Sequence, residues 1–455
     1  MSPVRDVLAA APAPPGRPAL WARDPAAGAF RAVSREELEE AVDRRAGALA
    51  REGAGAGHVH PVALEPDADG VATLLACWRL GAVPAPLNPR LTGAEGDEAR
   101  RALAGRDGGG AQVVLWTSGT SGRPRGVSLS WDALATHVDA AGHRLGLDPA
   151  RDTWLASLAL AHVGGLMVVV RALVTGSGLV VPGPLGPGGL SRLLAGEAAG
   201  GAPPVTHASL VPTQLLRLLD DTGSAPPPPP LRCLLLGGAH TPAGLLHRAV
   251  EAGWPVFPTY GMTEMASQVA TATPELVRRK PGSVGAPLEG VELRIGEGEE
   301  ILARGPTRAL GYVDGTPLTD TDGWVHTGDL GRLDEDGHLW VTGRRVERIV
   351  TGGVNVDALE VEEVLRSHPA VADACVVGVP DEEWGEVVGA CVVPVVGEFD
   401  EDAVGDWLRE RLQGAKRPRL WWRAAALPLN ANGKVDRLRV RALLAGGQEG
   451  VSRGR

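Results

Sequence analysis

Apolar residues recur with helical spacing in the first part of the chain. Between residues 34 and 50 they repeat every three or four positions, which predicts a helix with one buried face. Ser34, with Glu37 three residues later, is typical of a capped helix start. A second helix is predicted over residues 71–80. The apolar positions of the first helix are Leu38, Val42, Ala46 and Leu49.

Short apolar runs that end in glycine, serine or threonine alternate with the helical segments. Runs at 113–116, 231–236 and 256–258 each lead into a turn-forming cluster, so each is predicted to be a buried strand. Strands that alternate with helices indicate an α/β architecture with a mainly parallel sheet.

The pattern changes twice in the second half of the chain. Segments 291–295, 300–304, 324–327 and 338–342 are short strands between Gly/Asp turns, which predicts an antiparallel or barrel-like section. A helix over 358–366 capped by Asp357, strands at 376–379 and 389–396, and a helix over 402–412 then follow. We therefore expect a large α/β domain over 1–342 with a barrel-like β section, a hinge at 343–347, and a smaller mobile α/β domain over 348–455.

Composition narrows the function class. A net charge of −10 over 455 residues argues against a nucleic-acid partner. The four cysteines form no CxxC pair, so neither a zinc site nor a redox centre is indicated. No apolar run is long enough to span a membrane and no signal peptide is evident, so we expect a cytoplasmic protein. The only lysines are Lys280, Lys416 and Lys434.

A loop rich in glycine and hydroxyl residues follows the strand at 113–116. Its backbone amides can wrap an anion, and Arg125 near its end adds a cation. The spacing differs from that of P-loop NTPases. The loop reads Thr117, Ser118, Gly119, Thr120, Ser121, Gly122, Arg123, Pro124, Arg125, Gly126. Taken alone, it is also consistent with a surface turn.

Three further segments support an anionic nucleotide as the ligand. Residues 260–264 offer an aromatic ring, a hydroxyl and a carboxylate suited to Mg²⁺. Asp329 lies on a turn after a strand, where it could accept hydrogen bonds from ribose hydroxyls. Lys434 follows a glycine turn near the C-terminus.

Together, in this order, these motifs resemble the adenylate-forming (AMP-binding) superfamily of acyl- and aryl-CoA synthetases, luciferases and peptide-synthetase adenylation domains. The resemblance extends from Gly81 to Lys434. It implies an acyl-CoA synthetase that uses ATP, Mg²⁺ and coenzyme A through an acyl-AMP intermediate. The implied partner is a small-molecule carboxylic acid; a homodimer is left open.

The resemblance also implies roles for individual residues. The catalytic group comprises Lys434, Glu264 and Thr263, with Glu264 also holding the metal. The nucleotide group comprises Thr117, Ser118, Gly119, Thr120, Ser121, Gly122, Arg125, Gly238, Tyr260, Gly261, Asp329 and Arg344, with Tyr260 against adenine and Asp329 and Arg344 on the ribose. Gly352 and Gly353 belong to the loop expected to enter the site for thioester formation, and His162 to the acyl site.

Three features depart from the superfamily pattern. Arg125 stands where lysine is usual, Val346 where the hinge carries Asp or Lys, and the stretch between Asn88 and Gln112 is short. Arginine and lysine are not equivalent donors, so phosphate affinity can differ.

Two segments narrow the resemblance further. Residues 206–219 and 261–269 look like o-succinylbenzoate–CoA ligases of menaquinone biosynthesis. That substrate has a second carboxylate, which needs a cation or several hydrogen-bond donors. The candidates are Ser209, Ser267, Gln268 and Arg90. A CoA ligase for another aryl or medium-chain acid, a carrier-loading adenylation enzyme, and an inactive nucleotide-binding scaffold stay as alternatives.

Overall fold

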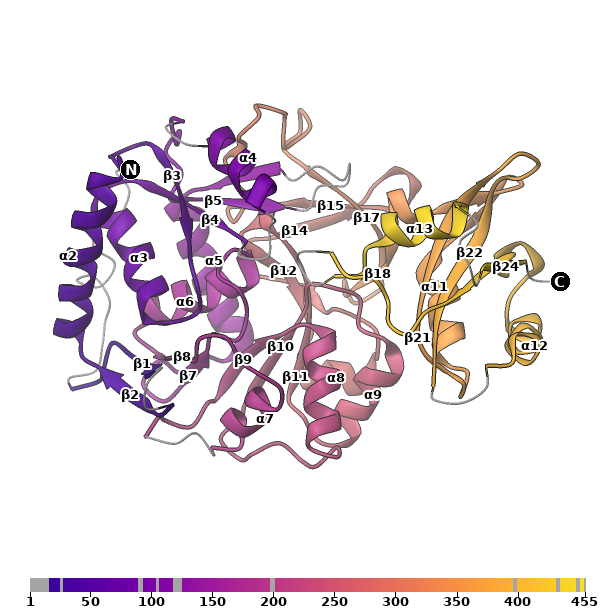
Figure 1. Ribbon diagram of the computed structural model, residues 1–455, viewed down its shortest axis with the longest axis horizontal. Helices are drawn as coiled ribbons and strands as arrows, with labels where there is room; N and C mark the ends of the chain where they lie inside the picture. Colours follow the sequence, from indigo (N-terminus) through magenta and orange to yellow (C-terminus); the bar gives the residue numbers. More distant parts are fainter. Residues whose placement is uncertain are drawn as a thin grey trace.

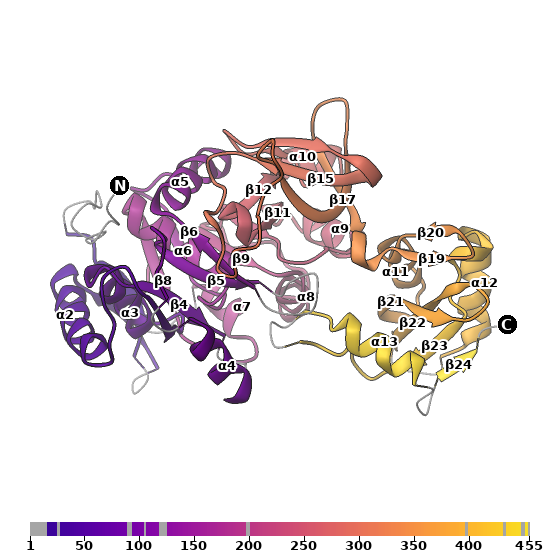
Figure 2. The ribbon, with the colours of Figure 1, turned by 90° about the horizontal axis from the view of Figure 1, so that it is seen from above.

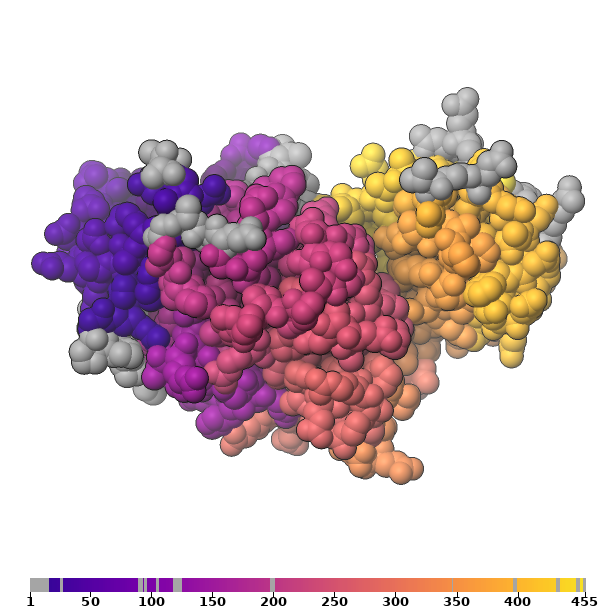
Figure 3. All heavy atoms as spheres, turned by 90° about the horizontal axis from the view of Figure 1, so that it is seen from below, coloured from indigo at the N-terminus to yellow at the C-terminus, as the bar shows by residue number. Residues whose placement is uncertain are grey.

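The computed structural model describes residues 16–24, 28–88, 93–103, 106–117, 125–196, 201–395, 399–430, 434–446 and 451–453, except the side chains of residues 94, 95 and 346. Figure 1 shows a large lobe built from the chain up to about residue 344 and a smaller lobe built from the rest. The two lobes are of unequal size also in the space-filling view of Figure 3.

The centre of the large lobe is a sheet of nine strands among the described residues. Its inner strands, β11, β10, β9, β7, β8 and β1, pair in parallel, whereas both edges are antiparallel. The mainly parallel sheet is thereby confirmed. In spatial order the strands are β13 (Ala286–Pro287), β12 (Ser267–Thr271), β11 (Val256–Met262), β10 (Cys233–Leu236), β9 (His207–Leu210), β7 (Thr153–Leu155), β8 (Gly178–Val181), β1 (Leu20–Arg23) and β2 (Phe30–Val33).

Helices cover both faces of this sheet. Along β10, Cys233 and Leu235 face one hydrophobic core, and Leu234 and Leu236 face the other. This burial on both faces explains why the strand is a continuous apolar run. The first core includes α3 (Ala68–Arg79), α5 (Trp131–Leu145) and α6 (Val163–Thr175); the second includes α7 (Gly189–Leu194), α8 (Pro212–Asp221) and α9 (Ala243–Glu251).

Smaller sheets complete the large lobe. Strands β3 (Val59–Ala63) and β4 (Val83–Leu87) pair in parallel, and α4 (Gly93–Leu103) follows them. Strand β16 (Gly311–Tyr312) pairs with β6 (Arg125–Leu129), which pairs with β5 (Val113–Thr117). The expected antiparallel section is a sheet of order β14 (Glu292–Ile295), β15 (Glu300–Arg304), β17 (Val325–Leu333) and β18 (Leu339–Arg344).

Helix starts agree with the sequence where a capping side chain is present. Helix α2 (Arg35–Arg51) has the complete capping box of Ser34 and Glu37, as predicted. Helix α3 begins three residues before the predicted start, because Asp67 caps it by accepting a hydrogen bond from Gly70 N.

The small lobe has its own hydrophobic cores. Helix α11 (Ala358–Arg366) is capped by Asp357 as predicted, but the two predicted strands are longer and form one antiparallel hairpin. The other elements are β19 (Ile349–Thr351), β20 (Val354–Val356), β21 (Val371–Asp381), β22 (Gly385–Pro394), α12 (Glu401–Arg411), β23 (Leu420–Arg423), α13 (Arg437–Ala445) and β24 (Val451–Arg453).

The four cysteines are buried and free. In the part of the chain that the structure describes, no helix combines the length and apolar character needed to cross a bilayer.

Candidate functional site

The parallel strands of the central sheet end at a common edge, and several predicted residues lie there. Ser209 is on β9, Gly238 follows β10, and Tyr260, Gly261, Thr263 and Glu264 lie at or after the end of β11. The carboxyl edge of a parallel sheet is where α/β proteins commonly bind ligands. The order of the strands therefore brings together residues that are far apart in sequence.

The predicted phosphate loop is bounded by a pair of strands. Residues 118–124, including five predicted contacts, lie outside the described residues, as does Arg90. Thr117 at the end of β5 pairs with Arg125 at the start of β6, so the loop closes between two fixed points.

Arg125 and Glu264 are linked through one tyrosine that the sequence analysis did not single out. The Arg125 guanidinium lies 3.9 Å from the Tyr312 ring centroid, and its Nε is 3.3 Å from Asp314 Oδ2. The Tyr312 hydroxyl donates to Glu264 Oε1 at 3.0 Å. Arg125, the predicted phosphate cation, and Glu264, the predicted metal ligand, thus both contact Tyr312.

Glu264 fits a divalent cation. Its side chain is buried, and its only hydrogen bond to a described side chain comes from Tyr312. It forms no ion pair within the described residues. Burial raises the pKa of Glu264, whereas hydrogen bonds and the charge of Arg344 lower it. A buried carboxylate with unused lone pairs suits a hard cation such as Mg²⁺.

Tyr260, Asp329 and Arg344 form a second cluster. The Tyr260 hydroxyl donates to Asp329 Oδ2 at 2.8 Å, and Arg344 Nε lies 2.8 Å from Asp329 Oδ1. Asp329 and Arg344 are paired across β17 and β18, so the sheet register sets this contact. Burial and the nearby Asp329 raise the pKa of Tyr260, so the phenol is neutral.

Lys434 of the small lobe lies close to this cluster. Burial by surrounding protein and the charge of Arg344 lower the pKa of Lys434, and Asp329 and Glu347 oppose that shift. The residue itself is exposed to solvent, which limits the effect of burial on its charge. The other two lysines are paired with carboxylates: Lys280 with Asp334 and Asp336, and Lys416 with Glu360.

The predicted thioester loop lies on a part of the small lobe away from the cluster of Tyr260, Asp329 and Arg344 (Figure 2). Gly352 and Gly353 have φ angles of +55° and +79° at the turn between β19 and β20, and Gly352 N donates to Trp384 O. Figure 2 shows β19 and β20 beyond α11 as seen from the large lobe. Of these two features of the small lobe, Lys434 is therefore the one that is near Asp329.

The acyl candidates lie around a strained turn. Gly261 is required at its position, because a Cβ there would come within 2.1 Å of Ser267 O. Ala266 and Ser267 have positive φ angles of 56° and 123°. Such strain is frequent at functional sites. His162 is the N-cap residue of α6, and Ser209 Oγ is buried with no hydrogen-bond partner among the described residues.

The amide of Gln268, a predicted substrate contact, already makes two hydrogen bonds inside the protein. Its Oε1 accepts from Arg171 Nη2 at 2.8 Å, its Nε2 donates to Thr271 Oγ1 at 2.9 Å, and it is 1% exposed. These bonds fix the orientation of the amide, and a direct contact of Gln268 with the substrate stays a prediction.

Arg171 was missed by sequence reasoning and is the most unusual residue of this region. It is 1% exposed on α6, and its Nε and Nη1 have no hydrogen-bond acceptor among the described residues. Burial lowers the pKa of Arg171 to about 10, so it remains charged at neutral pH. Burial also lowers the pKa values of His137 and His207, which are therefore neutral. Arg171 is thus a buried cation with two unused donors.

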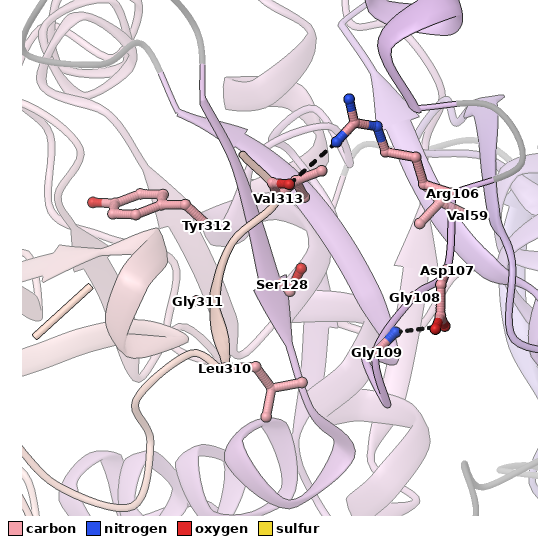
Figure 4. A pocket seen from close by; sticks show the side chains of 10 residues that line it. All are labelled: Val59, Arg106, Asp107, Gly108, Gly109, Ser128, Leu310, Gly311, Tyr312 and Val313. Atoms are coloured by element: carbon pink, nitrogen blue, oxygen red, sulfur yellow. Dashed lines mark hydrogen bonds between the residues drawn. The ribbon is translucent and has the colours of Figure 1, made fainter. Parts of the chain in front are cut away.

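A surface hollow of about 400 Å³ lies on another part of the large lobe. Figure 4 shows that Tyr312 points away from the other residues that line it. Since Tyr312 also hydrogen-bonds Glu264, the hollow adjoins the cluster of Arg125, Tyr312 and Glu264, and the Tyr312 ring points from the hollow toward that cluster (Figure 4). The lining residues are Val59, Arg106, Asp107, Gly108, Gly109, Ser128, Leu310, Gly311, Tyr312 and Val313.

Comparison with known protein families agrees with this geometry. The family model for AMP-binding enzymes matches residues 8–102 and 107–313. The family model for the C-terminal domain of AMP-binding enzymes matches residues 360–434. The chain belongs to the AMP-binding enzyme family. The resemblance inferred from the motifs and the expected α/β fold are thereby confirmed.

Individual members of this family are also similar to the chain. A 2-succinylbenzoate–CoA ligase of Bacillus cereus is 38% identical over 347 residues, which cover 73% of this chain and 70% of that protein. The o-succinylbenzoate CoA synthetase of Bacillus subtilis, solved with its acyl-adenylate intermediate, is 30% identical with a TM-score of 0.80; the match covers 93% of this chain and 95% of that one. Another form of that protein was solved with ATP and a magnesium ion.

The forms of the Bacillus subtilis enzyme differ in how well they superpose on this AMP-binding enzyme. A double mutant solved with a product analogue covers the same 93% and 95% at 30% identity, yet its TM-score is 0.64. The acyl-adenylate form, with the same coverage and identity, gives 0.80. The fold of this chain thus agrees better with the acyl-adenylate form.

Proposed function

We propose that this protein is an ATP-dependent carboxylate–CoA ligase that converts o-succinylbenzoate to o-succinylbenzoyl-CoA through an acyl-AMP intermediate. Its cofactors are ATP, Mg²⁺ and coenzyme A. The relatives that share 30–38% of its residues carry this activity in their names. A role in menaquinone biosynthesis follows from that product.

The observation that carries the choice of substrate is the buried Arg171. Two of its nitrogens, Nε and Nη1, have no acceptor among the described residues, next to Gln268 and the strained Ser267. A buried cation with spare donors is costly unless a ligand supplies an anion. The second carboxylate of o-succinylbenzoate is such an anion, and a simple fatty acid has none to offer.

The chemistry requires charge neutralisation at the phosphates. In the first step a carboxylate oxygen attacks the α-phosphorus and pyrophosphate leaves; in the second, the CoA sulfur attacks the acyl carbon and AMP leaves. Both partners of the first step are anionic, so cations at the transferred group lower the barrier. We assign this task to Lys434 and Arg125, with Mg²⁺ held by Glu264 supplying further positive charge.

The remaining site assignments are part of the same proposal. Asp329 and Arg344 are assigned to the ribose and Tyr260 to the adenine side, and Gly238 and Thr263 to the nucleotide edge. Residues 343–347 are assigned as the pivot between a large domain over 1–342 and a mobile lid over 348–455. Gly352 and Gly353 enter the site after the lid turns.

The pivot has a direct test. Val346→Pro disfavours helical backbone at the preceding residue, which lies in a short 3-10 helix over Arg345–Glu347. It is expected to slow thioester formation more than pyrophosphate exchange. Equal effects on both would count against a pivot at this position.

A panel of carboxylic acids tests the proposed activity. Pyrophosphate release is measured for o-succinylbenzoate, benzoate and medium-chain fatty acids, with and without CoA. We expect a strong preference for o-succinylbenzoate and CoA-dependent turnover. Activity restricted to fatty acids would overturn the substrate, and acyl-AMP accumulation without transfer to CoA would favour a carrier-loading enzyme. Cytoplasmic localisation and a homodimer remain predictions, to be tested by cell fractionation and sedimentation.

A further inference from the structure

A carboxylate of the small lobe is bound to the large lobe at the edge of the candidate site. Glu363 on α11 lies with its Oε1 2.6 Å from His240 Nε2, and Ala243 N is 3.4 Å from both of its oxygens. His240 comes two residues after Gly238, in the loop that follows β10. Both ribbon views place α9 near the small lobe (Figures 1 and 2).

Helix α9 has no cap of its own at this end. Its N-cap is Pro242, which offers no side-chain hydrogen bond, and the first turn contains no acidic residue. A helix N-terminus with free N–H groups favours a negative charge. Glu363 provides that charge from the other lobe, and both the α9 amide and His240 lower its pKa, although burial acts in the opposite direction.

The contact between Glu363 and His240 is present in the same structure in which Lys434 is near the nucleotide-side residues. Lys434 is near enough to Arg344 and Asp329 for their charges to shift its pKa while Glu363 is bound to His240. The ion pair Arg348–Glu299 also crosses between the lobes, but Arg348 directly follows residues 343–347, and Arg345, which pairs with Glu300, lies within them. Glu363 is carried by the body of the small lobe, so a turn of that lobe about the pivot separates it from α9.

We propose that Glu363 is a positioning residue for adenylation: by docking on His240 and the N-terminus of α9, it holds the lid so that Lys434 reaches the reacting groups. This inference rests on the proposed two-step reaction. We call this contact of Glu363 with His240 and the N-terminus of α9 the dock. It stabilises one orientation of the lid only, so its loss lowers the population of the orientation that supports adenylation.

Separate assays of the two half-reactions test this role. Glu363→Ala should lower the kcat of adenylation about 5- to 20-fold, since a helix-terminus charge and a partly exposed hydrogen bond with His240 are lost together. The KM for ATP should change by less than about 2-fold, because Glu363 does not contact the nucleotide-binding residues. Thioester formation from supplied acyl-AMP should be unchanged or faster.

Matched variants separate docking from a general loss of structure. Glu360→Ala, on the same helix, removes an ion pair with Lys416 inside the small lobe and should leave the ratio of the two half-reactions unchanged. His240→Lys retains an attraction for Glu363 and should keep more adenylation activity than His240→Ala. An equal fall in both half-reactions, or no change in adenylation, would overturn the dock.

The acid used is whichever one the unmodified enzyme activates. If that acid is not o-succinylbenzoate, the substrate proposal fails while the dock is still tested. If o-succinylbenzoate is activated and Glu363→Ala behaves like the unmodified enzyme, only the dock fails.

Discussion

The nucleotide side and the acyl side of the candidate site are built in opposite ways. On the nucleotide side the polar groups are held by one another: Asp329 binds Tyr260 and Arg344, and Tyr312 joins Arg125 to Glu264. On the acyl side, buried donors on Arg171 and Ser209 are left without partners among the described residues. The first side is preorganised before ligands bind, whereas the second needs a ligand to complete it.

The largest effect on activity is expected at Lys434, because its charge acts on the transition state of adenylation rather than on the cluster of Tyr260, Asp329 and Arg344. Lys434→Ala should lower adenylation by about 10²- to 10³-fold, the usual loss for one preorganised donor. Thioester formation from supplied acyl-AMP should be largely intact. The measurement is pyrophosphate exchange beside a single-turnover transfer to CoA.

Lys416→Ala is the matched control, since Lys416 is bound to Glu360 in the small lobe. It should leave both half-reactions unchanged. Comparable losses in the two half-reactions of Lys434→Ala would contradict the assigned role.

Arg171 tests the acyl side directly. Arg171→Met should lower kcat/KM for o-succinylbenzoate about 10²-fold, since a hydrogen-bonded charge pair with the second carboxylate is lost. For benzoate, which lacks that carboxylate, the change should stay within about 3-fold. A similar loss for both acids would show that Arg171 does not recognise the second carboxylate.

Thermal stability provides an independent control. Arg144 is also partly buried, but it donates to three backbone carbonyls, Thr271 O, Ala286 O and Pro287 O. Arg144→Met should therefore lower Tm, because it leaves acceptors unpaired. Arg171→Met should lower Tm less than Arg144→Met, because it leaves one acceptor, Gln268 Oε1, unpaired but also removes a buried charge whose Nε and Nη1 have no acceptor among the described residues.

The same contrast explains what could be read from the sequence. Nucleotide-side residues lie on turns directly after strands, so motifs such as those around Glu264 and Asp329 are contiguous in sequence. Arg171 lies in the middle of α6, whose nearly all-apolar sequence has no amphipathic period to mark it. Tyr312 was missed because it lies on a two-residue strand without a recognisable motif.

Element positions followed the same logic. Helices α2 and α11 were predicted closely because Ser34 and Asp357 are capping residues with a sequence signature. Strands β21 and β22 were predicted too short, because their ends are fixed by hairpin pairing rather than by local composition. The sequence also does not reveal that the amide of Gln268 is hydrogen-bonded to Arg171 and Thr271.

A smaller effect is expected at Tyr312, which joins the two charged groups of the nucleotide side. Its hydrogen bond lowers the pKa of Glu264 against the dominant effect of burial. Tyr312→Phe should therefore raise that pKa further, and a protonated carboxyl loses its affinity for Mg²⁺. The Mg²⁺ concentration for half-maximal activity should rise about 3- to 10-fold, the range expected for the loss of one ordinary hydrogen bond.

This effect has a defined pH dependence. The Glu264 carboxylate becomes protonated as pH falls toward its raised pKa. The Mg²⁺ concentration for half-maximal activity of the variant, divided by that of the unmodified enzyme, should therefore be larger at pH 6 than at pH 8. The phenylalanine ring still stacks on Arg125, so the KM for ATP at saturating Mg²⁺ should change little. A ratio independent of pH would argue against control of the Glu264 carboxyl by Tyr312.

The smallest effect is expected at Arg125, where this chain departs from the lysine usual in the superfamily. Arg125→Lys keeps the positive charge but loses the planar stack on Tyr312 and the contact of Nε with Asp314. An exposed cation–π contact contributes about 0.5–1 kcal/mol, so the KM for ATP should rise only about 2- to 5-fold. Arg125→Met, which removes the charge as well, should raise it much more. If both variants raise the KM for ATP by the same factor, the geometry of the guanidinium matters more than its charge. The nucleotide side would then depend on exact pairing as much as the acyl side does.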